Sequence, residues 1–256
     1  MLKVRVIPTL LWKDVGLVKG VSFDSWRRIG SILPAIKVYN TRQVDELIIV
    51  DIIAFREKRD PDFESVADFS SECFVPLTVG GGIRTIEDVK NLLRAGADKV
   101  SINSISYEDP ELITRVARAF GSQCVVASID AKKNKNNEYE CYSHSGTKQT
   151  GIQAYLWAKE MEKRGAGEIL LTSIERDGTM KGYDLDLIRS VTDAVKNIPV
   201  ITSGGAGNYQ HMYQALKNKA SAVAAASIFH FTQQTPLEAK SFLSGKGIPV
   251  RKTRII

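Results

Sequence analysis

Residues 76–82 (PLTVGGG) and residues 199–205 (PVITSGG) are two copies of one pattern, a short apolar run that ends in a glycine turn. Both copies continue through a helical pattern into a second apolar run, and these runs are followed by Ser104 and Ser227. Apolar runs that alternate with helical segments are typical of β-α units in a parallel sheet. The chain therefore contains the same β-α-β design twice.

The repeat extends upstream, and it is broken at one informative position. Residues 46–49 (ELII) match residues 168–171 (EILL), and the opening residues 6–11 (VIPTLL) match residues 125–130 (VVASID). The second half thus carries a carboxylate where the first half carries Leu11. A reaction that needs one carboxylic acid from each half of the chain would therefore lack the acid of the first half, at position 11.

The spacing of the apolar runs predicts eight β-α units, which indicates a (β/α)8 TIM barrel. We expect one domain over residues 1–256, built from half-barrels at about 1–121 and 122–245, with a doubly wound open sheet as the alternative. The segments 11–24 and 132–150 are expected to be long loops at the catalytic end. Strands are predicted near residues 4–10, 46–51, 76–80, 98–103, 123–129, 167–173, 199–203 and 221–226. Helices are predicted near residues 28–42, 62–73, 85–96, 110–120, 152–165, 184–196, 208–218 and 235–244.

Composition excludes several classes of protein. Three widely spaced cysteines without a CxxC pair argue against disulfides and zinc sites, and the histidines have no metal-ligand spacing. No apolar run is long enough to span a membrane, and the N-terminus lacks a signal-peptide layout. The net charge of +6 comes from Lys and Arg mostly interleaved with acids, which favours a solvated surface over nucleic-acid binding. We expect a cytoplasmic protein without metal, cofactor, membrane or nucleic-acid partner.

The repeated glycine turns predict two phosphate sites on opposite sides of the barrel mouth. Glycine lets the backbone approach an anion, and the N–H groups at a following helix start bind it. Ordinary tight turns also need glycine, so a purely structural role is the alternative. A substrate with a phosphate at each end fits two such sites, formed by Gly82, Asn103, Ser104, Gly178, Gly205, Ala226 and Ser227.

Charged residues are expected at both ends of the barrel. Asp130, at the end of the fifth strand, is the candidate acid or base, with a loop cap or lysine partner as the plainer role. Asp51, Asp177 and Lys19 are further mouth residues. The alternative for Asp177, which precedes a glycine, is an ordinary turn residue, and the alternative for Lys19 is a solvated loop lysine. At the other end of the barrel, two acids and two bases are expected to form a ring, because charges near the barrel axis are costly unless they are paired. The ring is either a stabilising plug or a gate over an axial passage. It comprises Arg5, Glu46, Lys99 and Glu168.

Long blocks of the chain resemble the cyclase subunit of imidazole glycerol phosphate synthase, from histidine biosynthesis. The similarity runs from about residue 1 to residue 251 and is specific because the matching blocks are long. They are residues 18–21 (VKGV), 77–84 (LTVGGGIR), 95–104 (AGADKVSINS), 120–124 (FGSQC), 129–132 (IDAK), 168–173 (EILLTS), 177–179 (DGT), 203–207 (SGGAG) and 226–230 (ASIFH).

The resemblance implies a barrel that receives ammonia from a glutaminase subunit in a heterodimer. Ammonia would enter through the charged ring, and Asp98 would lie on the face that the glutaminase covers. In the family, two aspartates at the mouth cyclise and cleave a bisphosphorylated substrate; Asp130 matches one of them, and the other is expected at the position of Leu11. The resemblance also places Thr172 and Ser203 among the substrate-binding residues.

Because leucine transfers no proton, we expect standard cyclase chemistry to be impaired, by about 10²–10⁴-fold for the loss of one acid-base group. The leading hypothesis is an ammonia-receiving synthase subunit that serves another phosphorylated or sugar acceptor, as in amidino- or amino-sugar synthesis for surface polysaccharides. The alternatives are a genuine cyclase subunit of histidine biosynthesis, or a non-catalytic conduit that passes ammonia to a separate amidotransferase.

Overall fold

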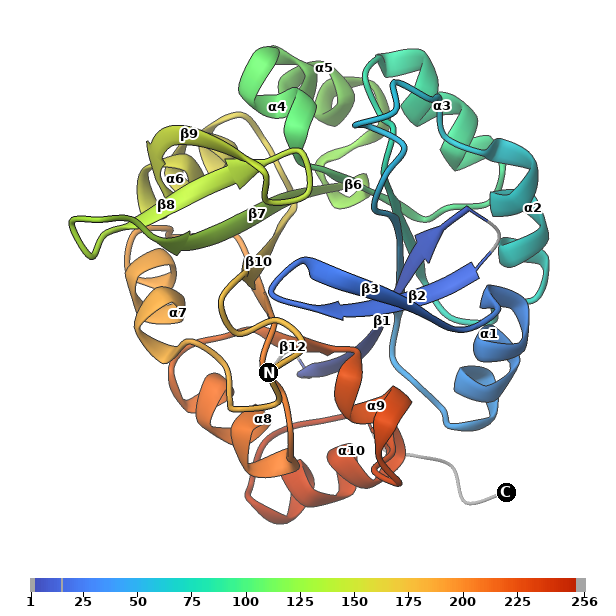
Figure 1. Ribbon diagram of the computed structural model, residues 1–256, viewed down its shortest axis with the longest axis vertical. Helices are drawn as coiled ribbons and strands as arrows, with labels where there is room; N and C mark the ends of the chain where they lie inside the picture. The colour runs from blue at the N-terminus through green and yellow to red at the C-terminus, as the bar shows by residue number, and fades with distance from the viewer. Residues whose placement is uncertain (1–2, 15, 252–256) are drawn as a thin grey trace.

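A computed structural model describes residues 3–14 and 16–251, so residues 1–2, 15 and 252–256 of the predicted domain lie outside it. Eight parallel strands close into a barrel in the order β1-β4-β5-β6-β7-β10-β11-β12, with β12 paired to β1 and β10 paired to β7 (Figure 1). The predicted (β/α)8 barrel is therefore confirmed. Its strands are β1 Arg5–Lys13, β4 Leu47–Asp51, β5 Leu77–Gly80, β6 Lys99–Ile102, β7 Val125–Lys133, β10 Glu168–Ser173, β11 Val200–Ser203 and β12 Ala222–Ala225.

Eight helices follow the barrel strands and form the outer ring seen in Figure 1. Thr85 and Thr235 begin two of them with capping boxes, and Asp184 caps a third through its side chain; such caps satisfy backbone N–H groups left free by a helix start. The helices are α1 Ile32–Thr41, α2 Phe63–Ser71, α3 Ile86–Arg94, α5 Glu111–Phe120, α6 Ala154–Lys163, α7 Leu185–Thr192, α8 Tyr209–Lys217 and α10 Pro236–Gly245. No described helix has the length and apolar content to cross a membrane.

The two segments predicted to be loops contain β-hairpins instead. Strands β1 and β7 continue past the barrel rim, and each pairs with an antiparallel strand of the segment that follows it. The predicted helix start near residue 28 is also wrong, because β3 occupies that position and α1 begins at Ile32. The hairpins consist of β2 Gly16–Val21 with β3 Asp24–Gly30, and of β8 Tyr139–Ser143 with β9 Lys148–Gln153.

Two short helices were not predicted from the sequence, and both begin at the barrel mouth. Helix α4 (Ser104–Glu108) follows β6, and helix α9 (Ser227–Phe231) follows β12. Five-residue helices have too few apolar positions to show a helical period. Their positions are equivalent in the two halves, so the repeat seen in the sequence is also a repeat of local structure.

The hydrophobic core has two parts. A large cluster lies between the barrel and its helices, as expected when strands are apolar on both faces. A smaller cluster fills the barrel interior and is built from Ile7, Ile48, Val126, Leu170, Ile201, Ala222 and Ala224. Buried apolar side chains thus separate the charged end of the barrel from its mouth.

Candidate active site

A pocket opens at the carboxyl ends of the strands, where TIM-barrel enzymes carry their chemistry. It encloses roughly 1160 Å³ when its open mouth is counted. The candidate acid and all the predicted substrate-binding residues line it, although they come from both halves of the chain. These residues are Lys19, Asp51, Gly82, Asn103, Ser104, Asp130, Thr172, Asp177, Gly178, Ser203, Gly205, Ala226 and Ser227.

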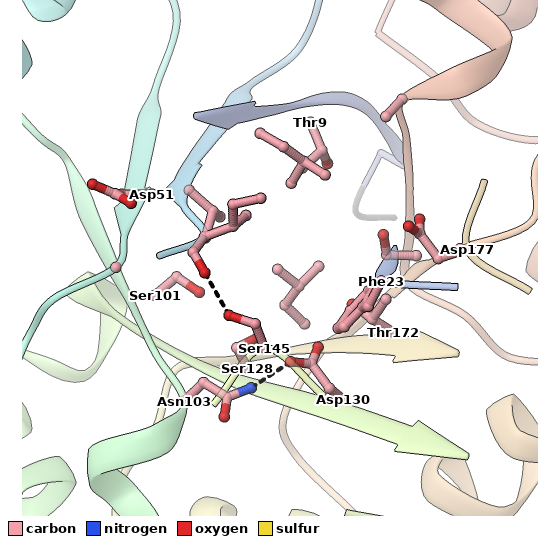
Figure 2. A pocket seen from close by; sticks show the side chains of 18 of the residues that line it. Thr9, Phe23, Asp51, Ser101, Asn103, Ser128, Asp130, Ser145, Thr172 and Asp177 are labelled. Atoms are coloured by element: carbon pink, nitrogen blue, oxygen red, sulfur yellow. Dashed lines mark hydrogen bonds between the residues drawn. The ribbon is translucent and has the colours of Figure 1, made fainter. Parts of the chain in front are cut away.

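Asp130 lies deep in this pocket near the end of β7. The Asn103 side-chain amide donates a hydrogen bond of 2.8 Å to its Oδ2 (Figure 2), and Thr172 is its register neighbour on β10. Burial, and then the negative charge of Asp177, raise the pKa of Asp130 to about 7, against smaller opposing effects of the Asn103 and Thr172 hydrogen bonds. A carboxyl group with such a pKa can hold a proton near neutral pH and deliver it.

Leu11 lies on the opposite wall of the pocket from Asp130. The two residues belong to β1 and β7, which are four strands apart in a closed barrel of eight. Leu11 is in register with Val50 on β4 and with Val18 on β2, and Val50 also lines the pocket. The wall that faces the acid is therefore apolar at this level.

Lys19 and Asp177 form a buried ion pair. The lysine Nζ lies 2.5 Å from Asp177 Oδ2, and the lysine side chain is only 1% exposed. Lys19 belongs to β2, whereas Asp177 follows β10, so the pair fastens the β2–β3 hairpin across the mouth. Each residue was predicted as a substrate contact, and in this structure each is the other's partner.

Asp51 has its carboxylate engaged within the protein. Its Oδ1 accepts hydrogen bonds from the backbone N–H groups of Ile53 and Ala54, at 3.0 and 2.9 Å, and its Oδ2 accepts one from Arg59 at 3.2 Å. Figure 2 shows the carboxylate directed away from the centre of the pocket. In this geometry Asp51 stabilises the loop after β4 rather than offering its carboxylate to the pocket.

The glycine turns of the two halves have the same backbone character. Gly81 and Gly82 have φ values of 106° and 74°, and Gly204 and Gly205 have values of 89° and 107°. A side chain would not fit here, since a Cβ at Gly205 would lie 2.1 Å from the Gly182 carbonyl oxygen. Left-handed glycine turns beside helix starts can bring backbone N–H groups towards an anion.

The two turns differ in how their serines are used. Ser104 Oγ accepts a hydrogen bond of 2.9 Å from the His144 backbone N–H. Ser227 is buried and its hydroxyl has no partner among the described residues. A buried polar group without a partner is costly, so the Ser227 hydroxyl is suited to a polar ligand at the second turn.

Sequence reasoning missed the aromatic part of the pocket. Phe23, Trp26 and Phe55 line it, and the first two rings are 6.4 Å apart. They come from the β2–β3 hairpin and the loop after β4, where strand periodicity gives no orientation. The usable signal was the pair Phe23 and Trp26, which lie close together at the end of the predicted long segment 11–24 and just beyond it, because exposed apolar side chains that cluster mark binding surfaces.

At the opposite end of the barrel, four charges alternate in a closed ring of ion pairs. Arg5 contacts Glu46 and Glu168, each at 2.6 Å, and Lys99 contacts the same two acids at 3.0 and 2.8 Å. Burial opposes the charge of Glu168, but hydrogen bonds and attraction from Arg5 and Lys99 outweigh it and lower its pKa. The predicted four residues thus satisfy one another.

Asp98 lies at this same end, in the turn before β6, and is exposed. Its Oδ2 accepts a hydrogen bond of 2.8 Å from the Leu77 backbone N–H. Within residues 3–14 and 16–251, no group of three or more His, Cys, Asp or Glu side chains is arranged to hold a metal ion.

Comparison with known proteins gives a consistent result. A family model described as "Histidine biosynthesis protein" matches residues 5–235. A protein of Endomicrobium trichonymphae named "Imidazole glycerol phosphate synthase subunit HisF" is 48% identical over 254 residues, which is 99% of this chain and 97% of the relative. A protein of the same name from Microcystis aeruginosa is 48% identical over 255 residues, 98% of this chain and 100% of the relative.

Proposed function

Because this chain belongs to the HisF family of histidine biosynthesis proteins, we propose that it is the ammonia-receiving subunit of a glutamine-dependent synthase whose acceptor chemistry uses one carboxylic acid. The acceptor is a phosphorylated small molecule held between the two glycine turns. The catalytic group is Asp130. The standard cyclase reaction, which in the family uses a second aspartate, is impaired by Leu11.

The observation that carries this proposal is the chemistry of the two facing walls. Asp130 can donate a proton near neutral pH because its pKa is raised to about 7. Across the pocket, Leu11 and Val50 present only hydrocarbon. Such a wall favours an acceptor whose facing side is uncharged, since a charged group there would lose hydration without gaining a partner.

The supply of ammonia is proposed to come through the charged ring. Its four residues close the barrel at the end remote from the pocket, and Asp98 is exposed beside them. A glutaminase subunit that covers this end would release ammonia next to the barrel axis. The proposed assembly is therefore a heterodimer of this chain with a glutaminase.

A second candidate is the standard cyclase subunit of histidine biosynthesis. The printed names of the relatives favour it over a role in surface-polysaccharide synthesis, for which the relatives offer no support. That polysaccharide role stays a prediction from the sequence. A non-catalytic conduit is less well supported, because the pocket retains an acid with a raised pKa.

Turnover of the standard bisphosphorylated cyclase substrate with ammonium salt separates the candidates. We expect the unmodified chain to be slow, and Leu11→Asp to raise kcat because it restores a second carboxylate opposite Asp130. Leu11→Asn is the matched control, since it adds polarity without an acid-base group. Turnover by the unmodified chain at 1–10³ s⁻¹, the ordinary range for enzymes, would overturn the altered-acceptor proposal in favour of the standard cyclase.

A further inference from the structure

The tip of the β8–β9 hairpin, residues 144–146, has an unusual backbone. His144, Ser145 and Gly146 have consecutive φ values of 53°, 56° and 78°. Left-handed conformations are unfavourable for residues with a Cβ and persist only where surrounding contacts enforce them. Two of these three residues are not glycine, so this backbone conformation is costly unless contacts with other residues hold it in place.

Those contacts reach across the pocket to the first half of the barrel. The Ser145 hydroxyl donates a hydrogen bond of 2.5 Å to the Ile52 carbonyl oxygen, and the His144 N–H donates one of 2.9 Å to Ser104 Oγ. The His144 ring also lies edge-on to Phe55, with centroids 5.0 Å apart. The hairpin extends β7, whereas Ile52 follows β4, so the tip passes over the ends of β5 and β6.

The tip also meets the other hairpin. A Cβ placed on Gly146 would lie 2.9 Å from the Phe23 ring, which shows that the two are in close contact. Phe23 is held in turn because the neighbouring Ser22 N–H donates a hydrogen bond of 2.8 Å to the Asp177 carbonyl oxygen. Ser145 and Phe23 are both pocket-lining residues, and Figure 2 shows the Ser145 hydroxyl turned towards its backbone partner rather than towards Asp130.

We propose that residues 144–146 are a clasp that opens to admit the acceptor and closes over it, and that the Ser145–Ile52 hydrogen bond sets how often it opens. The proposal rests on the proposed function only in taking this pocket as the acceptor site. The clasp is held by the two hydrogen bonds, by the ring contact of His144 with Phe55 and by the close contact of Gly146 with Phe23, against an unfavourable backbone conformation. Opening it also releases Ser104 Oγ, beside the first glycine turn, for a phosphate of the acceptor.

The first test measures hydrogen exchange of the His144 backbone N–H. Ser145→Ala keeps a Cβ at this left-handed position but removes the hydrogen bond to the Ile52 carbonyl oxygen. We expect the His144 N–H to exchange about fivefold faster, which is the effect of losing one ordinary hydrogen bond. The control is Thr150→Ala, which removes a hydroxyl bonded to the Cys141 carbonyl oxygen within the hairpin. Thr150→Ala should leave exchange at His144 unchanged.

The second test follows binding of fructose 1,6-bisphosphate by the fluorescence of Trp26, which lines the pocket, whereas Trp12 and Trp157 are each 6% exposed. If entry requires an open clasp, the association rate scales with the open fraction. Ser145→Ala should therefore raise it about fivefold, in step with the exchange rate. Thr150→Ala should not.

Two results of the exchange experiment would overturn the clasp. One is unchanged His144 exchange in Ser145→Ala, and the other is an equal effect of Thr150→Ala on exchange. An unchanged association rate beside faster exchange would also contradict it, because opening would then be unrelated to entry. If the probe binds none of the three proteins, the phosphate sites of the proposed function fail, and the exchange ratio still decides whether Ser145 fastens the clasp.

Discussion

Lys19 Nζ lies 2.5 Å from Asp177 Oδ2, in a buried ion pair whose two residues both line the pocket. Lys19, which the sequence predicted to contact an anionic substrate, is thus already paired with Asp177. The ion pair also places a negative charge near enough to Asp130 to raise the pKa of that carboxyl group. The same ion pair thus engages the positive charge of Lys19 and includes the carboxylate that, after burial, contributes most to the raised pKa of Asp130.

Asp177→Asn should lower the pKa of Asp130 from its value of about 7. The decrease is partial, because burial is the larger cause and is unchanged. Carbon-13 NMR of the aspartate carboxyl groups, followed from pH 4 to 9, measures it. Glu175→Gln, at an exposed residue of the same loop, is the control. The variant should also lose about 3–5 kcal/mol of stability, because the buried lysine is left without its counter-charge. An unmoved Asp130 titration would contradict the proposed influence of Asp177.

Asp130→Asn should make stability less dependent on pH. The folded protein holds the Asp130 proton up to about pH 7, whereas the unfolded chain releases it near the ordinary value of 3.8. The folded state therefore binds more protons between these values, and its stability falls as pH rises from about 4 to about 7. Asp130→Asn has no titrating group at this position, so its stability does not fall for this reason over the same pH range.

Thermal unfolding at pH 4 and pH 8 checks the expectation. Asp130→Asn should resemble the parent protein at pH 4 and exceed its Tm at pH 8. Asp60→Asn, at a side chain that is 82% exposed, is the control and should change neither value appreciably. A Tm difference of the same size at both pH values would show that Asp130 is not held with a raised pKa.

Lys99→Ala should distinguish a gate from a structural plug. It breaks the charged ring and leaves Glu46 and Glu168 with fewer partners. In a complex with a glutaminase, a gate predicts that product formation from glutamine falls while formation from ammonium salt is largely retained. Initial rates of product formation from glutamine and from ammonium salt, measured with the same acceptor, give the ratio of the two activities.

The control for this ratio is Lys240→Ala. Lys240 is buried and pairs with Asp45 at 3.2 Å, outside the charged ring. Its loss should reduce stability, and any loss of activity should be equal with both nitrogen sources. If Lys99→Ala behaves in the same way, the ring is a plug.

Gly205→Ala should disable one anion site and spare the other. The added methyl group would collide with the Gly182 carbonyl oxygen, in a backbone conformation with φ of 107°. Titration of the parent with fructose 1,6-bisphosphate should shift the amide signals of Gly82, Ser104, Gly205 and Ser227, whereas Gly151, in β9, stays unchanged. In the variant, only the signals of the first turn should shift. If the parent shows no shift at either turn, the glycines serve only to shape the backbone.

The sequence by itself determined the barrel and the repeat. Apolar runs on parallel strands are buried on both faces, so their pattern is local and continuous, and residues 76–82 and 199–205 identified equivalent turns. A strand end has a known place in a barrel. For this reason Asp130, Leu11 and the glycine turns could be assigned to the mouth, and the four ring charges to the opposite end, before their contacts were known.

The tertiary structure decided how the mouth is closed and which charges are already paired. Residues 11–24 and 132–150 lack an apolar period because only part of each hairpin packs on the barrel. Their strands were therefore invisible to pattern analysis. The pairing of Lys19 with Asp177 joins residues 158 positions apart, and the bond of Ser145 to Ile52 joins residues 93 apart. Such contacts depend on how separate segments meet, which no local pattern encodes.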